Sequence, residues 1–201
     1  MKKLLVISLA LFMMLGLVGM ASASYVWFDA SSIKGGGDLK PDTSWKLLPC
    51  EVVWLELYAS EIPTPGLISM GLIANYDPSQ FEVTPGTDFD HNNWWFGTLS
   101  TPPGAVDMTG GRLMTGLAGD NIHLGTIELH CIAPGTSLIS LIGHPPPYDD
   151  FVLLDGTVLD DSILLGKIEI ENIVPIPGTL LLLGSGLAGI FGLGRRKFNK
   201  K

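Results

Sequence analysis

Aspartates in short loops are the side chains of this sequence best suited to bind a ligand directly. Asp88 and Asp90 lie in one predicted loop, and Asp155 and Asp160 lie in another. Calcium prefers several oxygen ligands supplied by such loops, so the sequence indicates a possible calcium site, and no other cofactor is expected. The regular Asp-x-Asp-x-Asp-Gly pattern is missing, and the alternative is that these carboxylates are simply solvated surface groups.

The remaining polar residues show no pattern that indicates enzymatic activity. His123 and His130 are separated by an odd number of residues, so they would point to opposite faces of one strand, and no zinc-type His or Cys spacing occurs. No Gly-x-Ser-x-Gly nucleophile motif is present. With 20 acidic residues, some carboxylate pair will lie close together by chance, so proximity does not indicate a glycosidase. The sequence therefore predicts a protein that is not an enzyme.

Trp94 and Trp95 are the aromatic residues with the clearest functional potential. Consecutive residues on a strand face opposite sides, so at most one of the two side chains needs to fill a core. The other would offer a flat surface to a sugar ring, which makes both residues candidate glycan contacts. The alternative interpretation is that a tryptophan here covers the end of a sheet.

Cys50 and Cys131 are the only cysteines, and an even number in an exported protein favours a disulfide. A bond closing a loop of this length would stabilise the fold by about 4–5 kcal/mol. Strand alternation turns Cys50 outward and Cys131 inward, so the bond requires a bulge or a strand end near Pro49. Two separate thiols are the alternative.

Short apolar runs separated by Gly, Pro, Asn and Asp clusters fill the middle of the chain, and no stretch shows a sustained helical period. This pattern predicts one all-β domain over residues 24–172, an antiparallel sandwich. The expected strands are residues 25–28, 51–58, 67–76, 81–83, 112–117, 124–132, 137–142, 151–154, 157–159 and 163–170.

The two ends of the chain read as targeting segments. Residues 1–23 have a basic start, an apolar run and a small-x-small site, as expected of a signal peptide cut by signal peptidase. Residues 173–201 contain an uncharged stretch, predicted as a transmembrane helix over 177–194, and then a basic stop at Arg195, Arg196 and Lys197. The domain between them keeps five basic residues against all 20 acidic ones, a formal charge of −15, which disfavours nucleic-acid binding.

The tail resembles the PEP-CTERM sorting signal of bacterial exosortase substrates. The resemblance lies in Val174, Pro175, Ile176, Pro177 and Gly178, the leucine- and glycine-rich stretch that follows, and the basic end. Ile176 stands where that family has Glu. The resemblance implies an intermediate in the inner membrane, cleavage near the proline motif by an exosortase, and a place in the cell envelope or extracellular matrix. It also implies an association with exopolysaccharide and biofilm formation.

The body resembles the cohesin-like and carbohydrate-binding-module group of β-sandwiches. The resemblance rests on residues 72–83, which contain a Tyr-Asp-Pro-Ser turn between two strands, and on residues 125–137. It implies a jelly-roll sandwich and leaves the ligand open. Together the patterns predict an exported structural or adhesion protein of the cell surface. The alternative is a carbohydrate-binding module that contacts polysaccharide through an exposed tryptophan and acidic loops, with calcium as an optional ligand of these loops.

Overall fold

A computed structural model describes residues 23–48 and 50–173. The predicted signal peptide, the motif at 174–178, the helix at 177–194 and the basic stop at 195–197 lie outside the described residues, apart from the last residue of the signal peptide. Within the described ranges no helix is long and apolar enough to cross a membrane.

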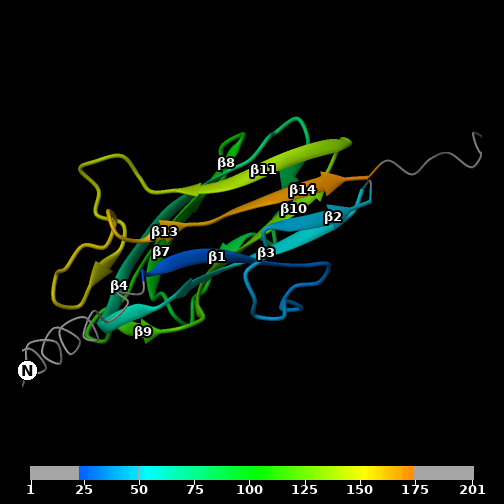
Figure 1. The fold of residues 1–201 in the computed structure, drawn as a ribbon. Helices are drawn as coiled ribbons and strands as arrows, with labels where there is room; N and C mark the ends of the chain where they lie inside the picture. Colours follow the sequence, from blue (N-terminus) through cyan, green and yellow to red (C-terminus); the bar gives the residue numbers. More distant parts are fainter. Residues whose placement is uncertain (1–22, 49, 174–201) are drawn as a thin grey trace, which may run out of the picture.

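The described chain forms two packed β-sheets, which confirms the all-β sandwich (Figure 1). Its strands in chain order are β1 (Tyr25–Ser31), β2 (Ser44–Leu47), β3 (Val52–Ser60), β4 (Ile62–Asn75), β5 (Phe81–Val83), β6 (Asp88–Phe89), β7 (Phe96–Ser100), β8 (Ala105–Gly111), β9 (Leu117–Gly119), β10 (Ile122–Cys131), β11 (Gly135–Ile142), β12 (Val152–Leu153), β13 (Leu164–Leu165) and β14 (Lys167–Asn172).

The first sheet, called sheet A, has the strand order β13-β1-β3-β10-β5, with β6 also paired to β10. The second, sheet B, has the order β2-β14-β11-β4-β8-β7, with β9 and β12 also paired to β4. The pairs are antiparallel except for β1 with β13 and β14 with β2, which are parallel. The prediction of a purely antiparallel sandwich is thus corrected at these two short pairings, which bring the end of the chain alongside its beginning.

Alternating apolar side chains explain why the two sheets close on each other. In β10, Ile127, Leu129 and Cys131 are buried, whereas Glu128 and His130 are partly exposed, as the sequence pattern predicts. Equivalent inward residues of β1, β3, β4 and β8 complete one continuous core. Burial of this apolar area is the main force that holds the sheets together.

Three predicted elements differ from the structure. Residues 157–159, expected as a strand, form only an isolated bridge between Val158 and Val152. β4 continues through Pro63–Gly66, which were expected to break the chain, because its register with β9 shifts there and leaves room for residues without a ladder donor. Residues 112–117, expected as a strand, form a turn that leads into β9. Met114 adopts a left-handed φ of 73° in this turn, and the N–H of Thr115 donates to the carbonyl of Leu113.

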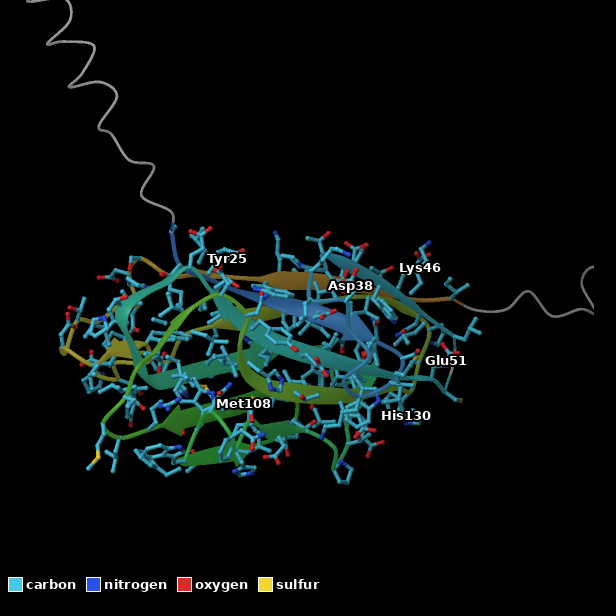
Figure 2. The ribbon with its side chains drawn as sticks, turned by 90° about the horizontal axis from the view of Figure 1, so that it is seen from below. Tyr25, Asp38, Lys46, Glu51, Met108 and His130 are labelled. Atoms are coloured by element: carbon cyan, nitrogen blue, oxygen red, sulfur yellow. The ribbon has the colours of Figure 1, made fainter. Side chains whose placement is uncertain are left out.

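The described chain begins and finishes at opposite ends of the sandwich. Tyr25 pairs with Ser60 at one end, and Asn172 pairs with Gly135 at the other, where β14 points away from the start of β1 (Figure 1). Figure 2 shows Tyr25 near one end and Glu51 toward the other. We call these the Tyr25 end and the Asn172 end.

Candidate functional site

The outer face of sheet B is a regular surface formed by neighbouring strands of the sheet. Its strands β7, β8, β4 and β11 bury one set of residues, including Met70, Leu72, Val106, Met108 and Ile139, so the alternate set faces outward. These outward residues are Phe96, Thr98, Ser100, Ala105, Asp107, Thr109, Gly111, Ser69, Gly71, Ile73, Asn75, Thr136, Leu138, Ser140 and Ile142. Asp107 is the only charged member of this set, but Lys167, Glu169 and Glu171 of β14 and Lys46 of β2 face the same side of the sheet.

Several large apolar side chains are exposed on this face. Phe96, Leu138 and Ile142 are 55%, 53% and 44% exposed, respectively. Between them lie threonine, serine and glycine, which leave the surface low and flat. In a domain with a formal charge of −15, these four strands carry a single carboxylate on this side, and the other charges of the face lie on β14 and β2 beside them. Such a combination of exposed apolar groups and few charges is typical of protein interaction surfaces.

The outer face of sheet A is less accessible. Asp29 and Glu56 point outward from β1 and β3 but are only 1% and 6% exposed, because the segment after β1 folds over them. The N–H of Leu39 donates to Asp29 at 2.8 Å, and the N–H of Gly35 donates to Glu56 at 2.7 Å. Burial raises the pKa of Asp29, although its backbone hydrogen bonds act in the opposite direction. These buried carboxylates hold a loop and leave no open site.

A cluster of three side chains borders the outer face of sheet B, and we call it the histidine clamp. His144 Nδ1 lies 2.6 Å from Asp150 Oδ1, and His144 Nε2 lies 3.0 Å from Asp107 Oδ1. Asp107 belongs to β8, whereas His144 and Asp150 lie in the loop between β11 and β12. A doubly protonated imidazole can donate to both carboxylates, so the clamp ties this loop to the sheet.

The loop fits here because β4 has a glycine under it. A Cβ on Gly71 would lie 2.3 Å from Asp150 Oδ1, closer than a carbon atom can approach. Asp150 is 5% exposed, and its own N–H donates to Asp160 at 3.0 Å, while Asp160 also accepts from the N–H of Phe151 at 2.8 Å. The folded loop leaves a hollow of about 430 Å³ over sheet B, lined in part by Thr98, Thr109 and Tyr148.

The protonation of His144 is set by two opposing effects. Burial alone would lower the pKa of His144, but its hydrogen bonds to Asp107 and Asp150 and the charges of both carboxylates outweigh burial and raise the pKa above 6.5. The charged imidazole is therefore the form that holds the clamp. Sequence reasoning missed this site because Asp107 lies 37 residues from His144 and the three residues follow no motif.

The structure buries one of the two predicted glycan contacts and exposes the other. Trp94 is completely buried, and its Nε1 donates to the carbonyl of His123 at 3.2 Å, so the prediction that it contacts a glycan is wrong. Its side chain fills the core, which the alternation argument allowed for one member of the pair. Trp95 is 55% exposed, and the guanidinium of Arg112 lies 5.4 Å from the centre of its ring.

The four candidate calcium ligands are already engaged in other contacts. Asp88 lies 3.2 Å from His91, and Asp90 lies 3.2 Å from His123. Asp155 accepts the N–H of Thr157 in a turn, and Asp160 holds the clamp loop. Across the part of the chain that the structure describes, no group of three or more His, Cys, Asp or Glu side chains is arranged to hold a metal ion. The geometry gives the calcium hypothesis no support.

Cys50 and Cys131 are both free thiols in the structure, yet they are neighbours across a strand pair. The N–H of Cys131 donates to the carbonyl of Glu51 at 3.0 Å. Cys50 has a left-handed φ of 66°, which is the local irregularity that strand alternation required near Pro49. Burial raises the pKa of the Cys131 thiol, partly offset by its hydrogen bonds with the backbone of Cys50 and Ala133. The disulfide stays a prediction, with both partners placed side by side.

This architecture is that of a cohesin-like β-sandwich. Similar solved structures include the cohesin module of a family 33 glycoside hydrolase from Clostridium perfringens, 11% identical with a TM-score of 0.55 over 77% of this chain and 100% of that chain. A non-cellulosomal cohesin from Archaeoglobus fulgidus is 12% identical with a TM-score of 0.52, over 74% of this chain and 91% of that chain.

A further similar chain belongs to a type I cohesin–dockerin complex from Clostridium thermocellum. It is 13% identical, with a TM-score of 0.52 over 74% of this chain and 99% of that chain. No protein-family model matches the sequence, and no curated protein matches it. The likeness therefore lies in the fold of the body.

Proposed function

We propose that this chain is an exported, non-enzymatic binding module that holds a partner protein at the cell surface or in the extracellular matrix. The observation that carries this proposal is the outer surface of β7, β8, β4 and β11 in sheet B, which exposes Phe96, Leu138 and Ile142 and carries one charged residue, Asp107, with the charges of β14 and β2 beside it. Similar folds occur in complexes with dockerins, which supports a protein partner for a sandwich of this type. The partner of this chain need not be a dockerin.

Export and anchoring are the second part of the proposal. The signal peptide at 1–23 would deliver the chain across the inner membrane, and an exosortase would cut near Pro175–Pro177. The sandwich would then remain in the envelope or in an exopolysaccharide matrix, as a structural or adhesion component of a biofilm. Loss of the basic tail would leave a strongly acidic module, which suits a soluble extracellular role.

A photo-crosslinking amino acid introduced at Leu138 or Ile142 of the full chain tests the binding face. We expect one discrete protein adduct in the producing cell, and we expect the Leu138 adduct to be lost when Ile142→Lys is added, because a charge in the contact must be desolvated. Glu82 on sheet A is the matched control position and should give no such adduct. Equal adducts at Leu138 and Glu82, or none at Leu138, would refute the proposal that this face binds a partner protein.

Intact-mass and fractionation analysis in hosts with and without an exosortase tests the sorting step. A mature chain that ends near Gly178 only in the host with the enzyme would support processing. A chain that keeps residues beyond Gly178 in both hosts would show that the tail is a plain membrane anchor.

Trp95 keeps a carbohydrate-binding alternative open, because its ring is exposed and lies beside Arg112. Stacking of a sugar on an exposed indole is a common means of glycan recognition. Glycan-array binding that is lost in Trp95→Ala would favour this alternative over a protein partner. Binding that is unchanged in Trp95→Ala would place the glycan elsewhere.

A further inference from the structure

Strand β7 is an open sheet edge of an unusual kind. One side of Phe96–Ser100 pairs with β8, and β7 is the last strand of sheet B on that side. Within the described residues, no member of β7 makes a backbone hydrogen bond outside its ladder with β8. An unpaired row of backbone donors and acceptors readily pairs with another strand unless charges, proline or a covering segment prevents it.

None of these protective features is present in β7. Its sequence, Phe-Gly-Thr-Leu-Ser, contains no charged residue and no proline. The other strands that border the two sheets are shorter than its five residues: β2 has four, β5 has three, and β13 has two. Lys46 of β2 is held by Glu171 and places charge at the opposite edge of sheet B.

We infer that β7 pairs with β7 of a second copy of this chain, antiparallel and about a twofold axis at Thr98. In this register Thr98 faces its own copy, and Phe96 faces Ser100 of the other chain. Threonine pairs across antiparallel strands are favourable, whereas like charges opposite each other are unfavourable. A strand without charge avoids that penalty when it pairs with a copy of itself. A twofold pairing also covers the open β7 edge of both copies in one contact.

Side chains next to the edge extend the contact. The ring of Phe96 lies over Gly111 of β8, since a Cβ on Gly111 would be 2.4 Å from it. Trp95 adjoins it and is 55% exposed, and beyond the end of β8 Leu113 and Met114 are 58% and 86% exposed. Apolar surface of this kind next to an open edge adds burial to the backbone pairing. Dimerisation would join two copies of sheet B into one continuous sheet.

Oxidative cross-linking of Thr98→Cys in the full chain, in its own cells, tests the pairing. Residues that face each other in such a pair have Cβ atoms about 5 Å apart, close to what a disulfide needs. Thr109→Cys on β8 is the matched control, because its copies would lie three strand spacings, about 14 Å, apart. Both variants keep the native cysteines, so cross-links through Cys50 appear equally in each.

We expect at least about tenfold more homodimer for Thr98→Cys than for Thr109→Cys. Equal cross-linking of the two variants, or a monomer only, would overturn the inference. An adduct of Thr98→Cys with a different protein would overturn it as well, because the edge would then accept a foreign strand.

Charge substitutions test the register independently of folding. Added to Thr98→Cys, the pair Phe96→Lys and Ser100→Lys places lysine opposite lysine and should reduce the dimer about tenfold. Phe96→Lys with Ser100→Glu places opposite charges together and should preserve it. If both combinations abolish or both preserve the cross-link, the proposed register is wrong.

Discussion

Removal of the imidazole at His144 should destabilise the protein strongly below about pH 6. His144→Ala deletes both hydrogen bonds of the histidine clamp, at 2.6 and 3.0 Å. It also leaves Asp150, which is 5% exposed, without its cationic partner. Loss of one partner of a buried ion pair typically costs about 3–5 kcal/mol. Because Asp107 is more open to water, we expect a loss of about 3 kcal/mol, at the lower end of that range.

The direction of the pKa shift of His144 determines how the effect of His144→Ala on stability changes with pH. The pKa of His144 is raised in the folded protein, so the folded state binds the proton more tightly than the unfolded state does. Its contribution to stability is fully present below the unfolded value of about 6.5 and is lost as the pH rises through the folded pKa. The stability difference between the wild-type protein and His144→Ala should therefore be larger at pH 5.5 than well above the folded pKa.

Urea unfolding of both proteins across this pH range measures the difference. His91→Ala is the matched control, because His91 also pairs with an aspartate, Asp88, but its side chain is 64% exposed. Exposed pairs contribute little, so the control should lose less than about 1 kcal/mol. A His144→Ala protein as stable as the wild type at pH 5.5, or a difference that grows with pH, would refute the reasoning.

Three further outcomes are expected. Gly71→Ala should cost about 1–3 kcal/mol in urea unfolding and speed hydrogen exchange in the loop of the histidine clamp, since its Cβ would collide with that loop; unchanged exchange would contradict the contact. Trp94→Ala should cost about 3–5 kcal/mol because its side chain is fully buried, whereas Trp95→Ala should cost less than about 1 kcal/mol; equal losses would show that the core assignment is wrong. Oxidised protein should lack free thiols at Cys50 and Cys131 by mass spectrometry, and reduction should lower stability by up to about 4–5 kcal/mol; two titratable thiols after mild oxidation would argue against the bond.

The parts of the fold that sequence could predict are those that follow strand alternation. β5 has the predicted limits, and β10 differs from its expected range by two residues at one end and one at the other. From Ile127 to Cys131, β10 alternates as predicted, because a buried face imposes a period of two. The prediction that His123 and His130 face opposite sides is wrong, because a bulge between His123 and Gly125 breaks the period and pairs both histidines with outward residues of β3. The cohesin-like resemblance of residues 72–83 agrees with the fold of the body.

Other features depended on contacts between distant residues. Residues 112–117 have the composition of a strand but turn at Met114, and no local signal gives its left-handed φ. β7 and β8 contain glycine and threonine rather than a dense apolar pattern, so the open edge was not predicted. Likewise, Trp94 and Trp95 lie just before β7 and not on a strand, so strand alternation could not tell which of them faces the core.

The opposite placement of Tyr25 and Asn172 makes the sandwich a rigid spacer. The regular part of β4, residues 67–75, corresponds to about 30 Å at about 3.3 Å per residue, and β14 continues beyond its end toward Asn172. A support that grips the chain beyond Ile173 would therefore stand at one end of this rod, while Trp95 and the loop of His144 would project from the other. A domain of this shape would hold its Tyr25 end away from a crowded surface without requiring a flexible linker.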